Sequence, residues 1–292
     1  MNTEEPTMPY DLLSLCLLGR MPALPGTWTT AWSLAPALVL PLLAWLALAL
    51  WRAPADRSTC TGAPAAGYRG IWSAGWCLLA LALVSPLCRL AATLVAGHMA
   101  QLLVLSVAAP LLMAVGGLAM PRQASRPSPG PRLVPATLAY AAVLWMRHLP
   151  SVYDAALTSP AVHVAVVASV VAASLWFWNA VLQSARGGAG GTGRAVLALV
   201  ATTAQTGLLG ALLTFAPGTF YPLQAGGATA WGLSPLEDQQ LAGMLMWVPG
   251  SLAYLAAGVV LALQRFHADD RAVPPPIAGS NRLWPTARSA TD

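Results

Sequence analysis

Seven apolar runs, separated by short polar or charged segments, account for most of the chain. They cover roughly residues 31–51, 71–88, 92–120, 133–146, 161–182, 195–216 and 239–263. Most approach the length of about 20 residues that a helix needs to cross the hydrocarbon core of a bilayer. Within a bilayer the backbone polar groups must be satisfied by the protein itself, which helices achieve. The pattern therefore predicts an all-α, polytopic membrane protein with seven transmembrane helices.

The runs divide the chain into three parts. Residues 1–29 contain an apolar stretch too short to span and lack the basic start of a signal peptide, so we expect an exterior or interfacial lead-in. Residues 30–265 form the predicted seven-helix membrane domain. Residues 266–292 include three consecutive prolines from Pro274, and we expect a disordered cytoplasmic tail.

Composition supports the membrane assignment and excludes one class of partner. Hydrophobic residues make up 57% of the chain and charged residues 9%, whereas soluble domains are about a quarter charged. All 15 basic residues are arginines, and they are dispersed between the apolar runs. The net charge of +5 therefore does not form the basic patch of a nucleic-acid-binding protein.

The positions of the arginines predict the orientation of the helices. If the N-terminus lies outside, only Arg20, Arg89 and Arg147 fall in outer segments, and the other twelve arginines fall in inner ones. Cytoplasmic loops of membrane proteins carry an excess of basic residues. We therefore expect an N-out, C-in topology.

Three of the four histidines fall at one depth in this topology, near the outer surface. His98 lies in the outer part of the third run, His148 follows the fourth, and His163 opens the fifth. Polar groups within membrane spans usually face the bundle interior and mark function. We interpret these imidazoles as candidate ligands of a metal or haem-related site, with ordinary hydrogen-bonded histidines as the alternative.

The seventh run begins at the same depth with a cluster of polar and sulfur-containing residues: Asp238, Gln239, Gln240, Met244 and Met246. In a helix, Gln240, Met244 and Trp247 share one face, and these side chains project together just inside one membrane surface. Thioether and imidazole ligands together suit copper best. Met244 and Met246 are therefore added to the candidate metal ligands.

Other residues at this level admit two interpretations each. Arg147 and Asp238 are possible ion-pair partners, and Asp154 either caps a short outer helix or carries a proton or cation. A Cys16–Cys88 disulfide is conceivable if both residues lie outside, whereas Cys77 lies within an apolar run and is expected in the core. The chain contains no catalytic triad, paired carboxylates or HExxH motif, so we do not expect an enzyme.

Four segments together resemble the CtaG family of cytochrome c oxidase assembly proteins. They read GHMAQLL from Gly97, WMRHLPSVYDAAL from Trp145, HVAVVASVVAASLWFW from His163 and DQQLAGMLMWVPG from Asp238. The resemblance covers roughly residues 30–265. It implies a bacterial plasma-membrane protein that helps to mature a haem-copper oxidase by supplying copper at the outer face. Implied partners are oxidase subunits, the lipid bilayer and other copper-handling proteins.

The resemblance also assigns family-like positions in this chain: His98, Gln101, His148, Asp154, His163, Asp238, Gln239, Gln240, Met246, Trp247 and Pro249. On this basis Gln101, Asp154, Asp238, Gln239, Gln240 and Trp247 would support the metal ligands or contact a partner. The chain departs from the family pattern at Leu102, Val166 and Val167, where further ligands are expected.

These departures keep alternatives open. The first is a metal-free membrane chaperone, or a divergent paralogue that has lost the metal site. The second is a copper or small-solute transporter, although the spans carry little charge and no inverted repeat is visible. The third is a seven-span receptor, which shares only span count and orientation.

Overall fold

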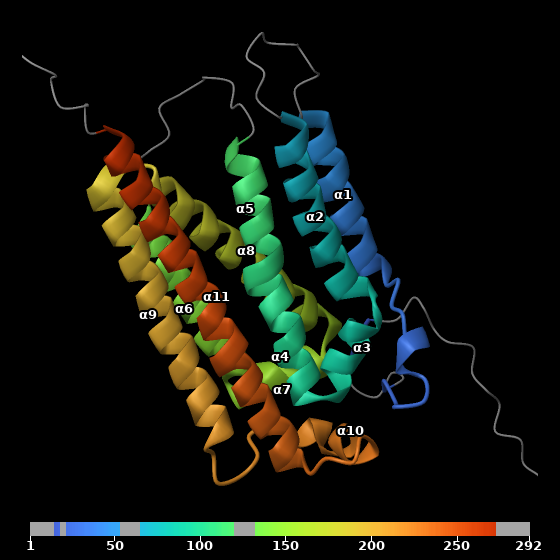
Figure 1. Cartoon of the computed structure of the whole chain (residues 1–292). Coiled ribbons are helices and arrows are strands. Elements are labelled where there is room, and N and C mark those ends of the chain that lie inside the picture. The colour runs from blue at the N-terminus through green and yellow to red at the C-terminus, as the bar shows by residue number, and fades with distance from the viewer. Residues whose placement is uncertain (1–14, 18–21, 53–64, 120–131, 273–292) are drawn as a thin grey trace, which may run out of the picture.

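The computed structural model describes residues 15–17, 22–52, 65–119 and 132–272, and no strand occurs among them. The described chain is almost entirely helical, which confirms the all-α prediction. Its long helices run side by side in a bundle (Figure 1). They are α1 (Pro36–Arg52), α2 (Ala65–Val84), α4 (Val95–Leu103) continued by α5 (Ala109–Ala119), α6 (Leu133–His148), α8 (Pro160–Ala185), α9 (Gly188–Thr214) and α11 (Pro235–Ala272).

When the described helices are judged by their length and composition, fewer of them qualify as membrane spans than the seven that the apolar runs predict. In the described part of the chain, four segments are long and apolar enough to cross a bilayer: Val95–Gly117, Pro160–Ala185, Gly188–Thr214 and Pro235–Asp269. A fifth is possible if α2 and α3 (Pro86–Thr93), which are bent by 51° at their junction, form one span. The remaining helices α1 and α6 have 17 and 16 residues. At 1.5 Å per residue each is about 25 Å long, which is less than the hydrocarbon core of about 30 Å.

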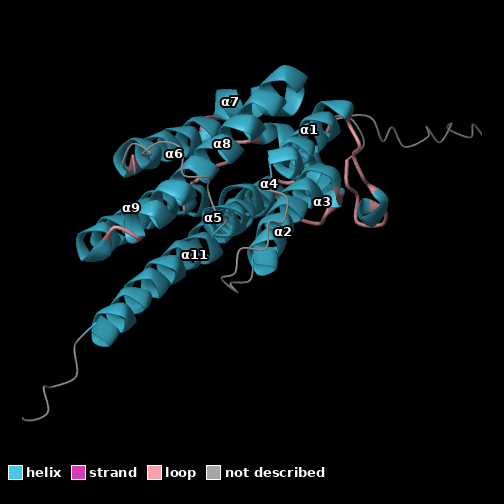
Figure 2. Ribbon diagram, turned by 90° about the horizontal axis from the view of Figure 1, so that it is seen from above, coloured by secondary structure: helices cyan, strands magenta, loops and turns pink. Residues whose placement is uncertain are grey.

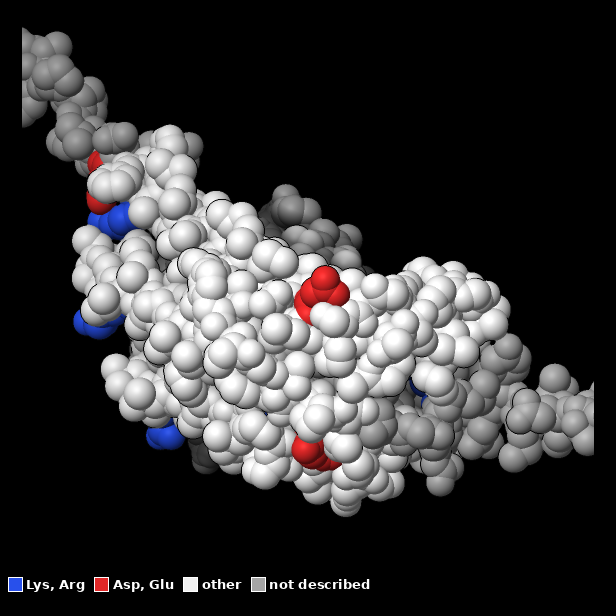
Figure 3. Space-filling view, turned by 90° about the horizontal axis from the view of Figure 1, so that it is seen from below, with Lys and Arg blue, Asp and Glu red and all other residues white. Residues whose placement is uncertain are grey.

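Short helices lie together at one end of the bundle, the lower end in Figure 1. They are α3, α7 (Pro150–Thr158) and α10 (Ala225–Ala230), with the 3₁₀ turns Trp28–Thr30 and Pro222–Gln224. We call this the capped end. Seen from below, its face is mostly uncharged, with two small acidic areas (Figure 3). The polar residues identified from the sequence lie here.

Close helix packing determines the arrangement of the bundle. The most extensive contact joins α9 and α11, and the next joins α2 and α5 (Figure 2). Gly210 of α9 and Gly243 of α11 allow the first pair to approach: a Cβ atom at Gly210 would lie 2.8 Å from the carbonyl oxygen of Gly243. Small residues let helix backbones pack closely in membranes.

The centre of the bundle is aromatic and is organised around a proline. Pro110 has no N–H to donate to the carbonyl of Ser106 four residues earlier, and the helix forms a π-helical segment at Val104–Ala108. The indole of Trp178 donates to that carbonyl at 3.0 Å. Tyr140 and Tyr254, both buried, share a hydrogen bond beside it at 2.5 Å. The packing thus satisfies a backbone group that the proline leaves unpaired.

The ends of the chain differ from the predicted boundaries. Helix α11 continues to Ala272, so residues 266–272 are helical rather than disordered. In the lead-in, Cys16, Leu17 and Ala23 are buried. The predictions for residues 1–14 and for the tail beyond 272 lie outside the described residues.

Candidate functional site

Helix breaks at the capped end leave backbone N–H and C=O groups without a partner in their own helix. Side chains from other positions in the chain form hydrogen bonds to these groups. Pro86 starts α3 and Pro160 starts α8, so neither residue offers an N–H to the carbonyl four positions earlier. A third break occurs at Leu94, which separates α3 from α4. Buried backbone groups are almost always paired, and the predicted site residues provide the partners.

Gln101 and His163 each bond to a carbonyl that a proline has left free. The Nε2 of Gln101 donates to the carbonyl of Ala82, four residues before Pro86, at 2.8 Å. The Nδ1 of His163 donates to the carbonyl of Ala156, four residues before Pro160, at 3.2 Å. Both side chains therefore hold a bend in place, and this role follows from the proline positions.

Asp238 of α11 caps the N-terminus of α4 across the bundle. Its carboxylate accepts from the N–H groups of Val95 at 2.8 Å and Ala96 at 3.0 Å. An acidic group at a helix N-terminus satisfies free donors and interacts favourably with the helix dipole. Both carboxylate oxygens are thus used by backbone, and the predicted ion pair with Arg147 is not formed.

Gln239, the next residue, ties α11 to the loop after α9. Its Oε1 accepts from the N–H of Phe220 at 2.6 Å, and its Nε2 donates to the carbonyls of Leu213 and Gly218. The side chain is buried and its hydrogen-bonding groups are occupied. Gln239 is therefore a brace of the capped end.

His98 is held between a backbone carbonyl and an arginine. Its Nδ1 donates to the carbonyl of Ala91 at 3.3 Å, which leaves the Nε2 lone pair as an acceptor. The Nη2 of Arg147 donates to that Nε2. Both ring nitrogens of His98, which was predicted as a metal ligand, are therefore occupied by protein groups.

His148 and His163 each keep one buried ring nitrogen without a partner. The Nδ1 of His148 donates to the carbonyl of Leu144 at 2.6 Å, and His163 uses Nδ1 in the same way. The Nε2 atoms of both rings are buried and have no hydrogen-bond partner. A histidine whose Nδ1–H is fixed by a carbonyl presents its Nε2 lone pair in a defined direction, which is the usual arrangement of a metal-binding histidine.

Tyrosines lie beside these imidazoles, and one of them bonds to the backbone of His148. The hydroxyl of Tyr221 donates to the carbonyl of His148 at 2.9 Å, and burial raises the pKa of Tyr221 to about 12. Tyr221 therefore stays a neutral donor under physiological conditions. Tyr153 stacks on Tyr221 at 4.0 Å and lies 4.6 Å from the ring of His98, between centroids. Its hydroxyl donates to Gln224, which in turn donates to the carbonyl of Ala91.

The face of α11 that contains Gln240, Met244 and Trp247 is partly exposed. Met244 and Trp247 are 46% and 40% exposed, and Gln240 is half-buried. The buried face contains Asp238, Gln239 and Met246 because α9 and α4 pack on that side. Met244 thus lies away from the imidazoles, and Trp247 packs beside Gly210 at the α9 contact.

The structure does not assemble the expected three-histidine metal site. Within the described part of the chain, no three His, Cys, Asp or Glu side chains form a group that could hold a metal ion. Asp154 lies on α7 with a buried Oδ1 that has no partner. His98 interacts electrostatically with His148 and with His163, and Arg147 acts on all three.

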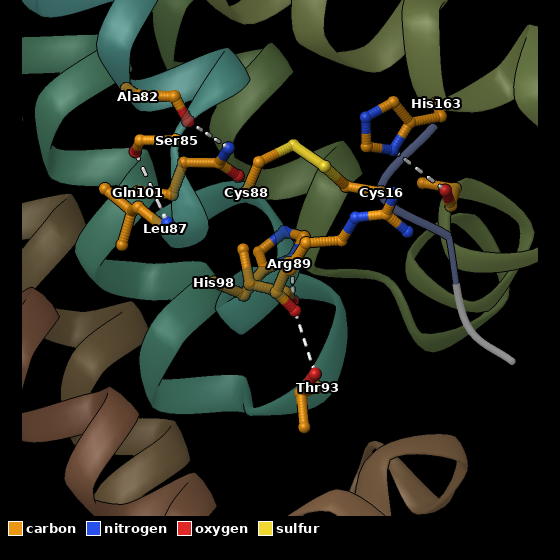
Figure 4. Close-up of a disulfide and its surroundings, with 12 residues drawn as sticks. Cys16, Ala82, Ser85, Leu87, Cys88, Arg89, Thr93, His98, Gln101 and His163 are labelled. Atoms are coloured by element: carbon orange, nitrogen blue, oxygen red, sulfur yellow. Dashed lines mark hydrogen bonds between the residues drawn. A yellow bond between two sulfur atoms is a disulfide. The ribbon is translucent and has the colours of Figure 1, made fainter. Parts of the chain in front are cut away.

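A disulfide between Cys16 and Cys88 joins the lead-in to α3, with the Cα atoms 5.7 Å apart. Figure 4 shows His98, His163 and the buried Arg89 around it. Cys77, expected in the core, is instead exposed on α2 because it faces away from α5. The pairing of Cys16 with Cys88 places an oxidised bond at the same end as the imidazoles.

Sequence reasoning missed three contributors to the site. Gln224 and Tyr221 belong to a segment without a distinctive motif, and only the fold brings them to α3 and α6. Arg147 was recognised as an outer arginine, but only the fold brings the end of α6 to His98 of α4. The carbonyl partners of Gln101 and His163 could have been predicted from the sequence, because a proline follows each carbonyl by four residues and leaves it without a helical N–H donor.

A family model described as cytochrome c oxidase caa3 assembly factor (Caa3_CtaG) matches residues 43–268. Searches of curated proteins and of solved structures find no match to this chain. The matched range includes every helix from α2 to α10, all of the imidazoles at the capped end and the run that begins at Asp238. Because the match extends over most of the residues, the chain belongs to the Caa3_CtaG family of cytochrome c oxidase assembly factors.

Proposed function

We propose that this chain helps to assemble a haem-copper oxidase by holding copper at the capped end and passing it on. The family supports the assembly role. The observation that carries the copper step is the pair of buried Nε2 atoms on His148 and His163, which have no partner. Such lone pairs are costly to bury unless a donor or a metal meets them. Copper is the cargo in this proposal, and the chain needs no catalytic turnover.

The proposed orientation places the capped end outside the cell membrane, with seven spans in an N-out, C-in arrangement. The Cys16–Cys88 disulfide supports this, because disulfides persist in oxidising compartments outside the cytosol. The distribution of arginines along the chain supports it as well. Helices α1 and α6 would complete the seven spans by local thinning of the bilayer, at a modest cost.

A metal-free chaperone remains the second candidate, and one contact favours it. Arg147 occupies the Nε2 of His98, so this histidine is unavailable to a metal in the observed arrangement. In that case the capped end would be a rigid surface that grips an oxidase subunit.

Copper binding separates the two candidates. The purified protein in detergent would be loaded with Cu(I), separated from free copper by gel filtration and analysed for bound metal. We expect wild type to retain copper and a His148→Ala/His163→Ala double variant to lose most of it. His267→Ala is the matched control, because His267 is exposed near the other end of α11.

If the double variant retains copper, the copper binds to other residues. If none of the three proteins binds copper, the metal-free chaperone is the better explanation. A deletion strain that expresses each variant then tests the assembly role through the oxidase absorbance spectrum. Normal spectra without the protein would contradict that role.

A further inference from the structure

The lead-in is fastened to α3 and to the end of α10. The N–H of Ala23 donates to the Oγ1 of Thr93 at 2.8 Å, and the carbonyl of Ala23 accepts from the Nε1 of Trp231 at 2.7 Å. Nearer the N-terminus, the disulfide joins Cys16 to Cys88 of α3. Both cysteines are 1% exposed and Ala23 is 0% exposed. The lead-in therefore lies against α3, and the disulfide is its covalent anchor there.

The disulfide also belongs to a small apolar cluster that is separate from the main core of the bundle. This cluster contains Cys16, Ala35, Leu38, Cys88 and Ala92. Cys88 and Ala92 come from α3, whereas the other three come from the lead-in and the entry to α1. On this side, α3 is therefore held by the segment to which the disulfide binds it.

Helix α3 also carries the carbonyl that fixes the ring of His98. About one turn after Cys88, the carbonyl of Ala91 accepts from the Nδ1 of His98 at 3.3 Å. A proton held on Nδ1 leaves Nε2 as the acceptor, and this atom receives the Nη2 of Arg147. His98 itself lies on α4, beyond the extended residue Leu94 that separates the two helices. The ring and the carbonyl that orients it thus belong to different helices joined by a bend.

The carbonyl of Ala91 has a second donor on the same side as the lead-in. The Nε2 of Gln224 donates to it at 2.9 Å. Nearby, α10 approaches α3 so closely that a Cβ atom at Gly227 would lie 2.0 Å from the carbonyl oxygen of Thr93. If the bond from His98 breaks, this carbonyl keeps a partner, so a shift of α3 avoids the cost of burying an unpaired acceptor.

We infer that the Cys16–Cys88 disulfide is a redox-sensitive lock that sets the tautomer of His98 through α3. While the disulfide is intact, the carbonyl of Ala91 keeps the proton on Nδ1, and Nε2 stays with Arg147. Once the disulfide is reduced, the lead-in releases α3, the carbonyl separates from the ring, and the proton occupies either nitrogen. The contact with Arg147 is then lost for part of the time, and the ring of His98 becomes available at the capped end. This inference goes beyond the proposed function, because it requires neither copper nor an oxidase subunit.

A dithiol opens the lock without any other reactant. One thiolate of the dithiol attacks a sulfur of the bridge, and the second bridge sulfur leaves as a thiolate with the electron pair of the S–S bond. The other thiolate of the dithiol then displaces the protein sulfur that it holds, so that the dithiol becomes a disulfide. Its two protons pass to the two cysteines. Because both cysteines are buried, the dithiol reaches the bond when the lead-in moves away from α3.

The test records ¹⁵N NMR spectra of the full-length protein in detergent, labelled on the histidine side chains. In the oxidised protein we expect separate signals for the protonated Nδ1 and the unprotonated Nε2 of His98. Dithiothreitol should move both signals towards a common average, because the ring then exchanges between tautomers. Cys16→Ser/Cys88→Ser should show the same change without reductant. Cys77→Ser is the matched control and should keep the oxidised spectrum, because Cys77 is a free cysteine outside the bridge.

His148 and His163 are internal controls for the route through α3. Each donates from Nδ1 to a carbonyl of α6 or α7, so their signals should keep their positions when the disulfide is reduced. If the signals of His98 do not move, the disulfide is only a structural link and the inference is overturned. If all three histidines change together, the effect does not pass through Ala91, and the inference is overturned as well. Circular dichroism shows whether each protein stays helical, and reduced wild type decides the result if the double variant does not fold. Copper retention is measured separately, so neither result bears on the proposed function.

Discussion

At the residue scale, the polar side chains of the capped end mainly complete broken helices. Gln101 and His163 satisfy carbonyls that Pro86 and Pro160 leave free, and Asp238 caps α4. These residues look like functional residues in the sequence because they are polar within apolar segments. Their first requirement is structural, and among the described histidines His148 and His163 retain a buried ring nitrogen without a partner.

Removing the cap on α4 should destabilise the bundle. Asp238→Ala leaves two buried N–H groups without an acceptor, and we expect a loss of about 1–3 kcal/mol in the free energy of unfolding. Asp238→Asn should lose less, because one oxygen remains. Thermal unfolding in detergent measures the effect, with Asp269→Asn on the exposed part of α11 as control. An unchanged melting temperature for Asp238→Ala would contradict the role of the cap.

At the element scale, the contact between α9 and α11 depends on the absence of side chains. A Cβ atom at Gly210 would also lie 2.9 Å from the backbone N of Trp247, and one at Gly243 would lie 2.6 Å from the carbonyl oxygen of Gly210. Because these neighbours are backbone atoms, they cannot move aside as a flexible side chain would. The helices must separate to accept any larger residue.

Gly210→Ala should therefore lower stability by about 1–3 kcal/mol through overpacking. Gly193→Ala on the same helix is the matched control, because nothing lies within 4 Å of a Cβ atom there. This second change should leave stability unchanged or raise it by up to about 1 kcal/mol through helix propensity. Equal melting temperatures for the two variants would show that the α9–α11 contact tolerates a methyl group.

At the scale of the whole molecule, the disulfide lies beside Gln101, His98 and His163 (Figure 4), at the end of the bundle where the short helices lie (Figure 1). A bundle of this kind would present its two ends to two different compartments. The proposed topology assigns the oxidising compartment to the capped end.

Impermeant thiol labelling of intact cells tests that orientation. In a Cys60→Ser/Cys77→Ser background with the disulfide kept, Gly218→Cys introduces a thiol at the capped end and Gly190→Cys one at the opposite end. Both glycines have open space around them. We expect Gly218→Cys to react in intact cells and Gly190→Cys to react only after permeabilisation. The reverse result would invert the topology.

The pattern of apolar runs by itself determined the helical class and the approximate positions of the long helices, because hydropathy is a local property of the chain. It also located the polar residues at one depth, since each stands near the end of a run. It treated residues 71–88 as one continuous span, although Ser85 and Pro86 bend it, and it placed Met244 among the candidate ligands, although this side chain is exposed.

Only the tertiary structure decided which polar atoms are used and which remain free. Asp238 reaches α4 rather than Arg147, Arg147 reaches His98, and Gln101 reaches a carbonyl of α2. These pairings depend on how the broken helices cross one another, and that geometry is not encoded in the spacing of residues along any one run. Because these crossings set the hydrogen bonds, the residues from Asp238 onward mainly stabilise the capped end, whereas the unpaired ring nitrogens belong to His148 and His163.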